Sequence, residues 1–551
     1  RPGGLAMRPA HPDRPARPLL VIGWDGATPE LLGPYLDDGT LPHLAQLRRR
    51  GGFAPLRSLI HPLSPAAWTS AFTGLNPGRH GVWDFGHLQP GTYEAAHTDA
   101  TCRHGATLWD IAEDCGLRSV VINVPLSHPA PQPKRSVFVP GLGADSLDGA
   151  CWPRGLASLI RSEAPDYAID VNSYEHADPA SFLAAVHRMV QARATVGEAL
   201  LRRERPDLFV CTFVATDRVQ HGFWKQGAHP FGDGSRVGWR FADAIRDVYR
   251  ALDTALGRLI EAAGPDATVL VVSDHGFGDL DGDLYLNSVL EDLGLLSVRR
   301  GDPSSGLRRL ARSVRGGLPA RFRGLLPARF GGGEPAVSDP TFGDIVWEET
   351  RAFARGLFGQ IWLNLRGREP LGQVEPGPEA DEILAQIEQA LLPLRTPDGR
   401  EPLVDAVFRA EDLYEGPLRS GAPDLIVVPR DYRWMTRSGR EFGARGQLFG
   451  PAAVGHTGNH RMDGVLVAGG PGISPNDSLP RQRLLDLTPT ALALLGIEVP
   501  RRLDGKPMTE LLGCDVGWTD ELPTRSPPSA QSGTDPERLA AQLEGLGYLA
   551  R

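Results

Sequence analysis

Short apolar runs alternate with longer amphipathic segments along most of this chain. Runs rich in Val, Leu, Ile and Phe that are bounded by turn residues predict buried strands. They cover residues 18–25, 119–125, 207–217, 268–274, 359–365, 424–429 and 464–469. Segments with helical periodicity lie between them, at 41–50, 66–73, 179–203, 240–263, 379–394 and 485–495. Strands that alternate with helices at this spacing predict an α/β fold with a largely parallel sheet.

Three of the predicted strands end on an aspartate, namely Asp25, Asp217 and Asp274. In an open parallel sheet, ligands bind at the carboxyl ends of the strands, so strands far apart in sequence can bring their carboxylates together. His221 follows Asp217 by four residues, and His275 follows Asp274 directly. A single aspartate after a strand is usually a turn former or a helix cap. Three of them, two with a histidine, predict a site for a divalent metal such as Zn²⁺ or Mn²⁺.

Composition narrows the class of protein further. Of the 551 residues, 41% are hydrophobic and 23% are charged, as in soluble globular proteins. No apolar run approaches the roughly 20 residues that span a bilayer, so we expect no transmembrane segment and a cytoplasmic location. The net charge of −9, without an extended basic stripe, argues against binding to duplex nucleic acid. Five scattered cysteines without a CxxC pair argue against a disulfide framework or a thiolate zinc site.

Several segments depart from the α/β pattern. Residues 1–17 are rich in Pro and Arg and predict a disordered lead before a catalytic domain that spans 18–512. Within that domain, about 300–340 form an Arg-rich insertion: a solvated and partly helical segment, a basic lid over an anionic substrate, or a surface for acidic lipid headgroups. Residues 513–535 read as a linker. Residues 536–551 predict a short amphipathic helix that docks on the body or on a partner subunit, which leaves a homo-oligomer open.

Ser64 is the candidate nucleophile. It stands directly before Pro65 and an apolar helix, where an N-cap residue belongs. Helix N-termini attract anions, and a hydroxyl placed there beside a metal could ionise and attack a phosphoryl group. Alone, this pair predicts only a good helix cap. The nearby Thr69, Ser70 and Thr73 fall inside the helix, where we expect their hydroxyls to bond backbone carbonyls.

Five motifs then give a resemblance to a known family. They read IGWDGA at 22–27, SPAAWTSAFTGLNPGRHGV at 64–82, TDRVQH at 216–221, SDHGFG at 273–278 and GNHR at 458–461. In this order, over about 18–512, the chain resembles the alkaline phosphatase superfamily, in particular its type I phosphodiesterase/nucleotide pyrophosphatase branch. The resemblance implies a three-layer fold, with helices on both faces of the sheet, and two divalent metal ions per chain.

The resemblance also implies which residues form the site. For one ion the implied ligands are Asp25, Ser64, Asp274 and His275, with Ser64 also the nucleophile. For the other they are Asp217, His221 and His460, with His456 as the alternative to His460. The implied reaction is in-line attack of Ser64 on a small phosphoester, through a phosphoseryl intermediate.

A phosphodiesterase is the function that we expect. Monoesterases of the superfamily commonly meet the extra charged oxygen of the substrate with an Arg or Lys, whereas Arg79, Arg218 and Arg461 have no matching role. The aromatic residues near the motifs could bind the second substituent of a diester; they are Trp24, Trp68, Trp83, Phe85, Phe223 and Trp224. Many diesterase relatives carry Asn where this chain has Asp84, and a carboxylate there would repel phosphate unless it faces away or binds a cation.

Three alternatives to a phosphodiesterase stay open. A phosphomonoesterase would use the same two-metal scaffold, as would a sulfatase or phosphonate hydrolase. The sulfatase is disfavoured because Ser64-Pro65 does not match the Cys/Ser-x-Pro-x-Arg sequence that this chemistry needs. A non-catalytic metal-binding or ligand-binding protein is the alternative from another class.

Overall fold

The computed structural model describes residues 17–525, with gaps at 90, 145, 173–175, 177, 226–240, 300–341, 437–441, 443–445, 453–454 and 524. The predicted Arg-rich insertion and C-terminal helix therefore lie outside the described residues. So do residues 1–16 of the predicted lead and most of the second half of the predicted linker.

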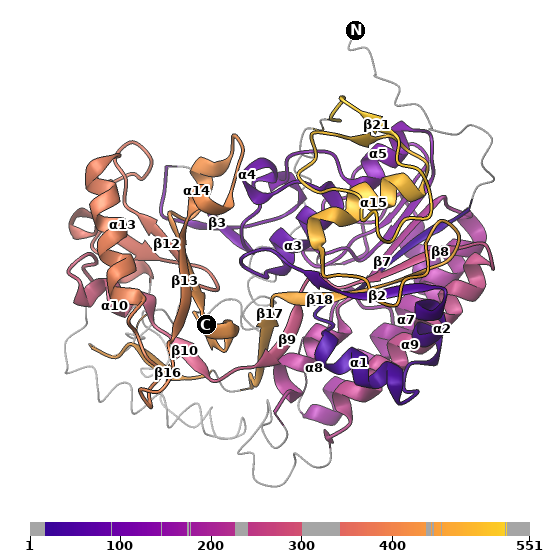
Figure 1. The fold of residues 1–551 in the computed structure, drawn as a ribbon, viewed down its shortest axis with the longest axis horizontal. Coiled ribbons are helices and arrows are strands. Elements are labelled where there is room, and N and C mark those ends of the chain that lie inside the picture. Colours follow the sequence, from indigo (N-terminus) through magenta and orange to yellow (C-terminus); the bar gives the residue numbers. More distant parts are fainter. Residues whose placement is uncertain are drawn as a thin grey trace, which may run out of the picture.

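An eight-stranded sheet forms the centre of the larger part of the molecule (Figure 1), with the strand order β19-β2-β18-β8-β1-β7-β5-β6. Its strands are β1 (Leu19–Trp24), β2 (Gly51–Arg57), β5 (Ser119–Ile122), β6 (Val137–Val139), β7 (Leu208–Phe213), β8 (Thr268–Val272), β18 (Asp463–Gly469) and β19 (Gln482–Arg483). Strand β1 lies between β7 and β8 and is parallel to both. Only β18 runs antiparallel to its neighbours in this sheet. The predicted largely parallel α/β fold is confirmed.

Helices cover both faces of this sheet because its strands are apolar on both sides. Leu20, Ile22 and Trp24 of β1 pack into one core cluster, whereas Leu19 and Val21 pack into the other, as the two-residue period of a strand requires. The first cluster includes α1 (Pro29–Asp37), α2 (Pro42–Arg49), α6 (Leu156–Glu163), α7 (Pro179–Glu204), α8 (Ala215–Phe223) and α9 (Ala244–Ala263). The second includes α3 (Ser64–Thr73), α5 (Leu108–Asp114) and α15 (Leu487–Leu494).

A separate four-stranded antiparallel sheet lies beside the larger part, on the left in Figure 1. Its strands follow the order β11 (Ala352–Ala354), β12 (Gln360–Leu363), β14 (Leu425–Pro429) and β13 (Val404–Arg409). Helices α10 (Leu286–Asp292) and α13 (Pro378–Leu391) share its apolar core. The strands predicted at 359–365 and 424–429 belong to this sheet and not to the central one.

Short elements connect these parts and frame the site. The remaining strands are β3 (Gly86–Leu88), β4 (Ala95–His97), β9 (Gly276–Asp279), β10 (Gly282–Leu284), β15 (Trp434–Met435), β16 (Phe449–Pro451), β17 (Gly458–Arg461), β20 (Val499–Pro500) and β21 (Trp518–Thr519). The short α-helices are α4 (Pro77–His80) and α14 (Ala410–Leu413). Strand β17 pairs with β9 directly after the predicted His275 ligand, so it brings His460 to the same end of the sheet.

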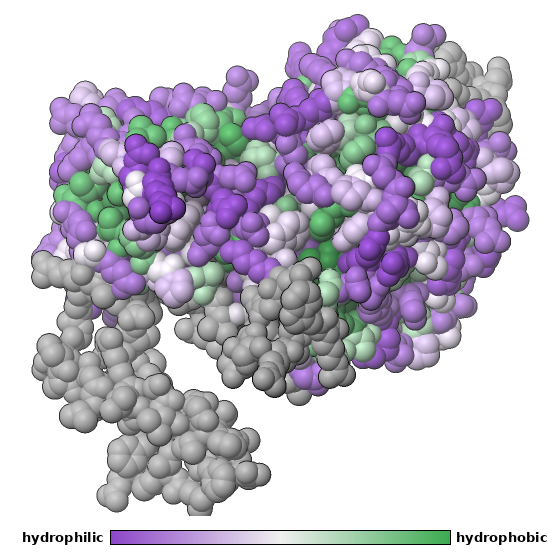
Figure 2. Space-filling model, turned by 60° about the horizontal axis from the view of Figure 1, so that its bottom comes forward, coloured by the Kyte–Doolittle hydropathy of each residue, from purple (hydrophilic) through white to green (hydrophobic). Residues whose placement is uncertain are grey.

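The described surface is mainly polar. Figure 2 shows hydrophobic residues in separate patches among hydrophilic ones on one face of the molecule. Among the residues that the structure describes, Leu371 and Leu392 are the only exposed large hydrophobic side chains. No helix in the described ranges is both long enough and apolar enough to cross a bilayer.

Candidate active site

Three strands of the central sheet lead into one buried cluster of acidic and imidazole side chains. Asp25 follows β1, and Asp274 and His275 follow β8. Strand β7 ends at Phe213, and Asp217 lies in the first turn of α8, not at the strand end as predicted. All three aspartates are almost completely buried, so the predicted meeting of carboxylates at this edge of the sheet is what the fold produces.

The first group of atoms that could bind a metal surrounds the Nε2 atom of His275. This nitrogen lies 3.6 Å from Oδ1 of Asp25 and 3.5 Å from Oδ2 of Asp274. The hydroxyl of Ser64 lies 3.2 Å from the same nitrogen. One nitrogen and three oxygens from three separate segments of the chain therefore converge on one point.

The second group is a triangle of equal sides. Oδ1 of Asp217, Nε2 of His221 and Nε2 of His460 lie 3.3 Å from one another. The two groups adjoin, because the rings of His275 and His460 stack with their centroids 3.6 Å apart. Asp217, His275 and His460 also offer ligand atoms within 4.8 Å of one another.

Compared with His460, whose Nε2 lies 3.3 Å from Asp217 Oδ1 and from His221 Nε2, His456 contacts the second group through its ring. Its ring packs edge to face on that of His221, with 5.6 Å between the centroids. The geometry thus favours His460 over His456 as a ligand.

Backbone carbonyls fix the tautomers of the three histidines. The Nδ1 atoms of His221, His275 and His460 lie 3.3, 3.0 and 2.8 Å from the carbonyls of Gly458, Gly276 and Pro62, respectively. A carbonyl can only accept, so each Nδ1 carries the proton and donates it. In the neutral ring, each Nε2 then presents a lone pair to the carboxylate oxygens, an arrangement that a cation between them would stabilise.

Among the described residues, one oxygen of each of the three carboxylates accepts a hydrogen bond and the other does not. Oδ2 of Asp25 accepts from Trp68 Nε1 at 2.8 Å, and Oδ1 of Asp274 accepts from the Gly26 amide at 3.3 Å. Oδ2 of Asp217 accepts from the Arg218 guanidinium. Each remaining oxygen is buried and has no hydrogen-bond donor within the described part of the chain. Buried acceptors without a partner are rare, so these three oxygens fit metal ions as their missing partners.

The pKa values of these groups reflect the same concentration of charge. Burial, together with the charges of Asp274 and Asp217, raises the pKa of Asp25 well above its usual range. Burial and the Asp217 charge raise the pKa of Asp274 to about 8. Burial opposes ionisation of Asp217 as well, but His221, His460 and Arg218 outweigh it and hold its pKa well below the usual range. A cation at this site would relieve the repulsion between the carboxylates.

Gly26 and Trp68 support the site, although the sequence did not single them out for this purpose. Gly26 adopts φ +71°, and a Cβ atom there would lie 3.2 Å from the Cα atom of Asp217. Trp68 lies one helical turn after Ser64, so the helix that carries the hydroxyl also anchors Asp25. Their places inside the IGWDGA and SPAAWTS motifs are the signal that could have identified them.

Ser64 is the first residue of α3 and not its N-cap as predicted. Leu63 takes the capping position, and no side chain caps this helix end. The Ser64 hydroxyl instead faces His275. The hydroxyls of Thr69 and Thr73 bond the carbonyls four residues before them, as predicted.

The expectation for Ser70 is wrong, because its hydroxyl bonds a side chain and not a backbone carbonyl. Its partner is Nε2 of His80, at 2.8 Å. Since the Val82 amide donates to His80 Nδ1, the proton is on Nε2 and the imidazole donates to Ser70. The His80 of the second motif thus fastens α4 to α3.

Asp84 faces the second sheet. Its Oδ1 accepts from the Phe85 amide at 2.6 Å, and its Oδ2 accepts from the Leu357 amide at 3.0 Å. Gly356 adopts φ +84°, and a Cβ atom there would lie 2.5 Å from Asp84 Oδ2, so this contact needs glycine. Asp84 therefore binds the loop before β12 to the larger part of the molecule.

Replacing Asp84 by asparagine is expected to change the pH dependence of stability. Burial raises the pKa of Asp84 from its usual 3.8 to about 6, so over this interval the folded chain holds a proton that the unfolded chain has released. The resulting stabilisation is complete below the unfolded pKa and is lost as the pH rises through the folded one. Relative to Asp84→Asn, the wild type should lose about 2 kcal/mol of unfolding free energy between pH 4 and pH 7. Chemical denaturation of both proteins measures this difference, and a difference independent of pH would contradict the assignment.

The loop that Asp84 holds also covers the histidine cluster. Phe358 is fully buried, and its ring centroid lies 5.4 Å from that of His460 and 5.6 Å from that of Tyr432. Its φ of 60° is unusual for a bulky residue, so the surrounding contacts must hold it there. The second sheet thus supplies part of the wall around His460.

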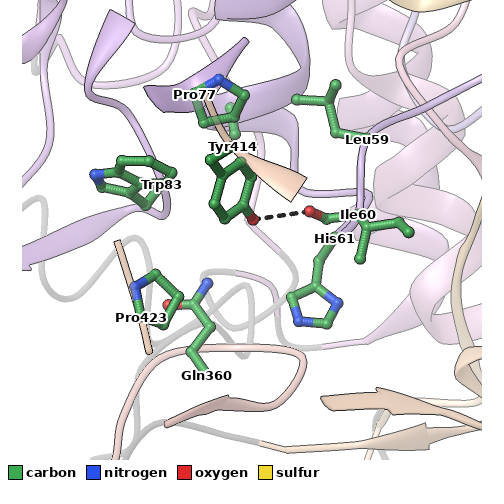
Figure 3. Close-up of a pocket in the computed structure, with 9 residues that line it drawn as sticks. Leu59, Ile60, His61, Pro77, Trp83, Gln360, Tyr414 and Pro423 are labelled. Atoms are coloured by element: carbon green, nitrogen blue, oxygen red, sulfur yellow. Dashed lines mark hydrogen bonds between the residues drawn. The ribbon is translucent and has the colours of Figure 1, made fainter. Parts of the chain in front are cut away.

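A small pocket lies between the two parts of the molecule (Figure 3). Trp83 and Tyr414 meet edge to face, with 4.8 Å between ring centroids, and the Tyr414 hydroxyl donates to the Ile60 carbonyl at 2.9 Å. His61 and Gln360 line the pocket from opposite sides of the junction. Its other lining residues are Leu59, Ala66, Pro77 and Pro423. Because Ala66 belongs to the first turn of α3, an aromatic wall borders the turn that carries Ser64.

Four of the six aromatic residues considered for substrate contact belong to core clusters instead, namely Trp24, Trp68, Phe85 and Phe223. Trp24 is fully buried and packs on Tyr249, with 6.2 Å between centroids. Trp68 is equally buried and stacks on Phe72. Trp83 and Trp224 are half-buried: Trp83 lines the pocket of Figure 3, and Trp224 packs on Phe277, whose ring contacts His221.

The three arginines near the motifs bind groups of the protein itself. Arg79 bonds the Arg502 carbonyl and Asp504. Arg461 donates to the carbonyls of Tyr432, Asn459, His460 and Asp279. Arg218 bonds the carboxylates of Asp170 and Asp217.

Fold and site together define a class of protein. A largely parallel sheet between two layers of helices, with a buried Asp/His centre beside a serine at a helix start, is the arrangement of the alkaline phosphatase superfamily. Within it, the chain belongs to the type I phosphodiesterase/nucleotide pyrophosphatase family, whose family model matches residues 19–448. It is therefore a hydrolase that acts on phosphoric ester bonds. The match ends before His456 and His460, so the preference between them rests on the geometry described above.

Solved structures share the fold at low sequence identity. Two structures of phosphonoacetate hydrolase from Sinorhizobium meliloti 1021, in complex with phosphonoformate and with phosphonoacetate, match over 86% of this chain and 94% of theirs. Their TM-scores are 0.53 and 0.54, with 17% identity in each case. A search among curated proteins found no match.

Proposed function

We propose that this protein is a metal-dependent phosphodiesterase with two divalent ions per chain, Zn²⁺ or Mn²⁺. The observation that carries the proposal is the division of the carboxylate oxygens: each of Asp25, Asp217 and Asp274 has one anchored oxygen and one buried oxygen without a donor among the described residues. One ion would be held by Asp25, Ser64, Asp274 and His275. The other would be held by Asp217, His221 and His460. Asp and His ligands of this kind suit Zn²⁺ and Mn²⁺.

In the proposed reaction Ser64 is the nucleophile. When bound, the two ions would supply the positive charge that lowers the pKa of the serine hydroxyl and offsets the negative charge that develops on the phosphoryl and leaving oxygens. Ser64 Oγ attacks phosphorus in line with the leaving oxygen and becomes phosphorylated. The N-terminal end of α3 favours the negative charge that gathers beside it. Attack of water on the phosphoseryl group then releases the product and restores the hydroxyl.

A diester is the proposed substrate class. A phosphomonoester carries an additional anionic oxygen, which an arginine or lysine could neutralise. Arg79, Arg218 and Arg461 each bond groups of the protein instead. A diester carries a second organic substituent, for which the half-buried rings of Trp83 and Trp224 offer aromatic surfaces.

The proposal predicts that bis-p-nitrophenyl phosphate has a higher kcat/KM than p-nitrophenyl phosphate. Both are assayed with the full-length, metal-loaded protein at one pH, and with aryl phosphonate and aryl sulfate esters in parallel. A clear preference for the monoester would reject the diesterase proposal and leave the broader class of phosphoric ester hydrolase.

A chelator should abolish the activity while the circular dichroism spectrum stays close to that of the metal-loaded protein, because a large α/β core does not depend on metal to fold.

A further inference from the structure

Arg218 joins a buried carboxylate to the proposed metal ligand Asp217. Its Nε and Nη2 atoms donate to the two oxygens of Asp170, at 3.0 and 2.8 Å, and its Nη1 atom donates to Oδ2 of Asp217. The side chains of Arg218 and Asp170 are only 5% and 3% exposed. The planar guanidinium is therefore held at two edges, by Asp170 at one and by Asp217 at the other.

Asp170 is itself held from the central sheet. The fully buried Arg193 of α7 donates to the Ile169 carbonyl at 2.7 Å and to the Thr212 carbonyl at 2.8 Å. Asn123, just after β5, also donates to the Ile169 carbonyl, at 3.1 Å. Thr212 lies in β7, the strand that leads to α8. Arg193 therefore binds both this strand and the segment that carries Asp170.

The direction of the Arg218 contact decides how Asp217 can bind a cation. With Oδ2 occupied by the guanidinium, only Oδ1 faces His221 and His460, so the carboxylate is restricted to one coordinating oxygen. Stability alone is a weak reason for such a contact, since the desolvation of a buried ion pair offsets much of its Coulomb energy.

We propose that Arg218, held by Asp170, is a positioning residue that restricts Asp217 to one coordinating oxygen and thereby sets the metal affinity of the Asp217/His221/His460 site. The proposal rests on the proposed function, because it presupposes a metal at that site. In this proposal Arg218 binds the metal ligand Asp217 and does not contact the substrate. The basic residue next to this ligand therefore does not neutralise the additional anionic oxygen of a monoester.

The test compares variants at both ends of the contact. Asp170→Asn removes the anchor of the guanidinium, and Arg218→Lys keeps the charge but lacks the planar fork. If either fails to fold, the double variant Asp170→Asn/Arg218→Gln leaves no unpaired charge from this pair. The matched control is Asp424→Asn, which breaks a bidentate ion pair with Arg368 at the second sheet.

Competition titration of zinc against a chelator measures the affinity of each metal equivalent in the full-length protein. We expect the Asp170 and Arg218 variants to bind one of the two equivalents about 10- to 100-fold more weakly, as when the partner of a metal ligand is lost. The other equivalent should be unchanged. Asp424→Asn should lower thermal stability and leave both affinities as in the wild type.

Three outcomes would overturn the proposal. Wild-type zinc affinities in the Asp170 and Arg218 variants, with reduced stability alone, would mean a purely structural ion pair. A raised KM with both metals retained would mean that Arg218 contacts the substrate. A wild-type protein that binds no zinc or manganese would reject the proposed function, and this proposal with it, so failures at the two levels are distinguishable.

Discussion

Replacing Ser64 by alanine is expected to lower kcat by at least about 10³-fold, the scale of loss when a nucleophile is removed from an active site. The hydroxyl lies 3.2 Å from Nε2 of His275, within the first group of donor atoms. The stability should hardly change, because no side chain caps the start of α3 and the variant loses no capping bond. Single-turnover kinetics and metal analysis of the same preparation separate lost chemistry from lost metal.

Thr69→Ala is the control for this result. The Thr69 hydroxyl is buried in the same helix, but it donates to the Pro65 carbonyl at 2.6 Å and not to a site residue. This variant should keep most of the wild-type kcat. An inactive Thr69→Ala beside an active Ser64→Ala would mean that the nucleophile is assigned to the wrong residue.

Replacing His460 by alanine is expected to empty one of the two metal sites. Its Nε2 atom is one corner of the 3.3 Å triangle with Asp217 and His221. Loss of a ligand should weaken metal binding by at least as much as loss of a ligand's partner, so we expect about 100-fold or more. Elemental analysis should then find about one equivalent of metal, and kcat should fall with the occupancy of the lost site.

His456→Ala is the matched control, since it removes a histidine from the same stretch of chain. His456 packs edge to face on His221, whereas the 3.3 Å triangle is formed with His460. Its loss should lower metal content much less than loss of His460. Equal losses in the two variants would show that both histidines coordinate, or that the ligand is misassigned.

The central strands, and the aspartates and histidines that meet beside them, could be predicted because their signals are local. Strand β1 is apolar at every position, as a strand covered on both faces must be, and Asp25 is the first charged residue after it. The same pattern identified β7 and β8. By contrast, β2 was missed, because its sequence GGFAPLR is interrupted by glycine and proline.

The remaining features depend on contacts between distant positions. The apolar pattern of β12 does not tell which sheet it joins, so its place in the second sheet could not be predicted. Trp68 is anchored to Asp25, 43 residues away, and Arg218 to Asp170, 48 residues away. A sequence predicts that such residues are buried or charged, but only the folded chain shows which atoms they meet.

The backbone partners of the histidines have an evolutionary consequence. A carboxylate or amide that orients a ligand ring can be lost through a single codon change. The acceptors for His460 and His221 are main-chain carbonyls, those of Pro62 and Gly458, and these persist whatever side chain the position carries. The orientation of these two rings therefore depends on the course of the backbone. Substitutions at positions 62 and 458 can change it only if they move the backbone.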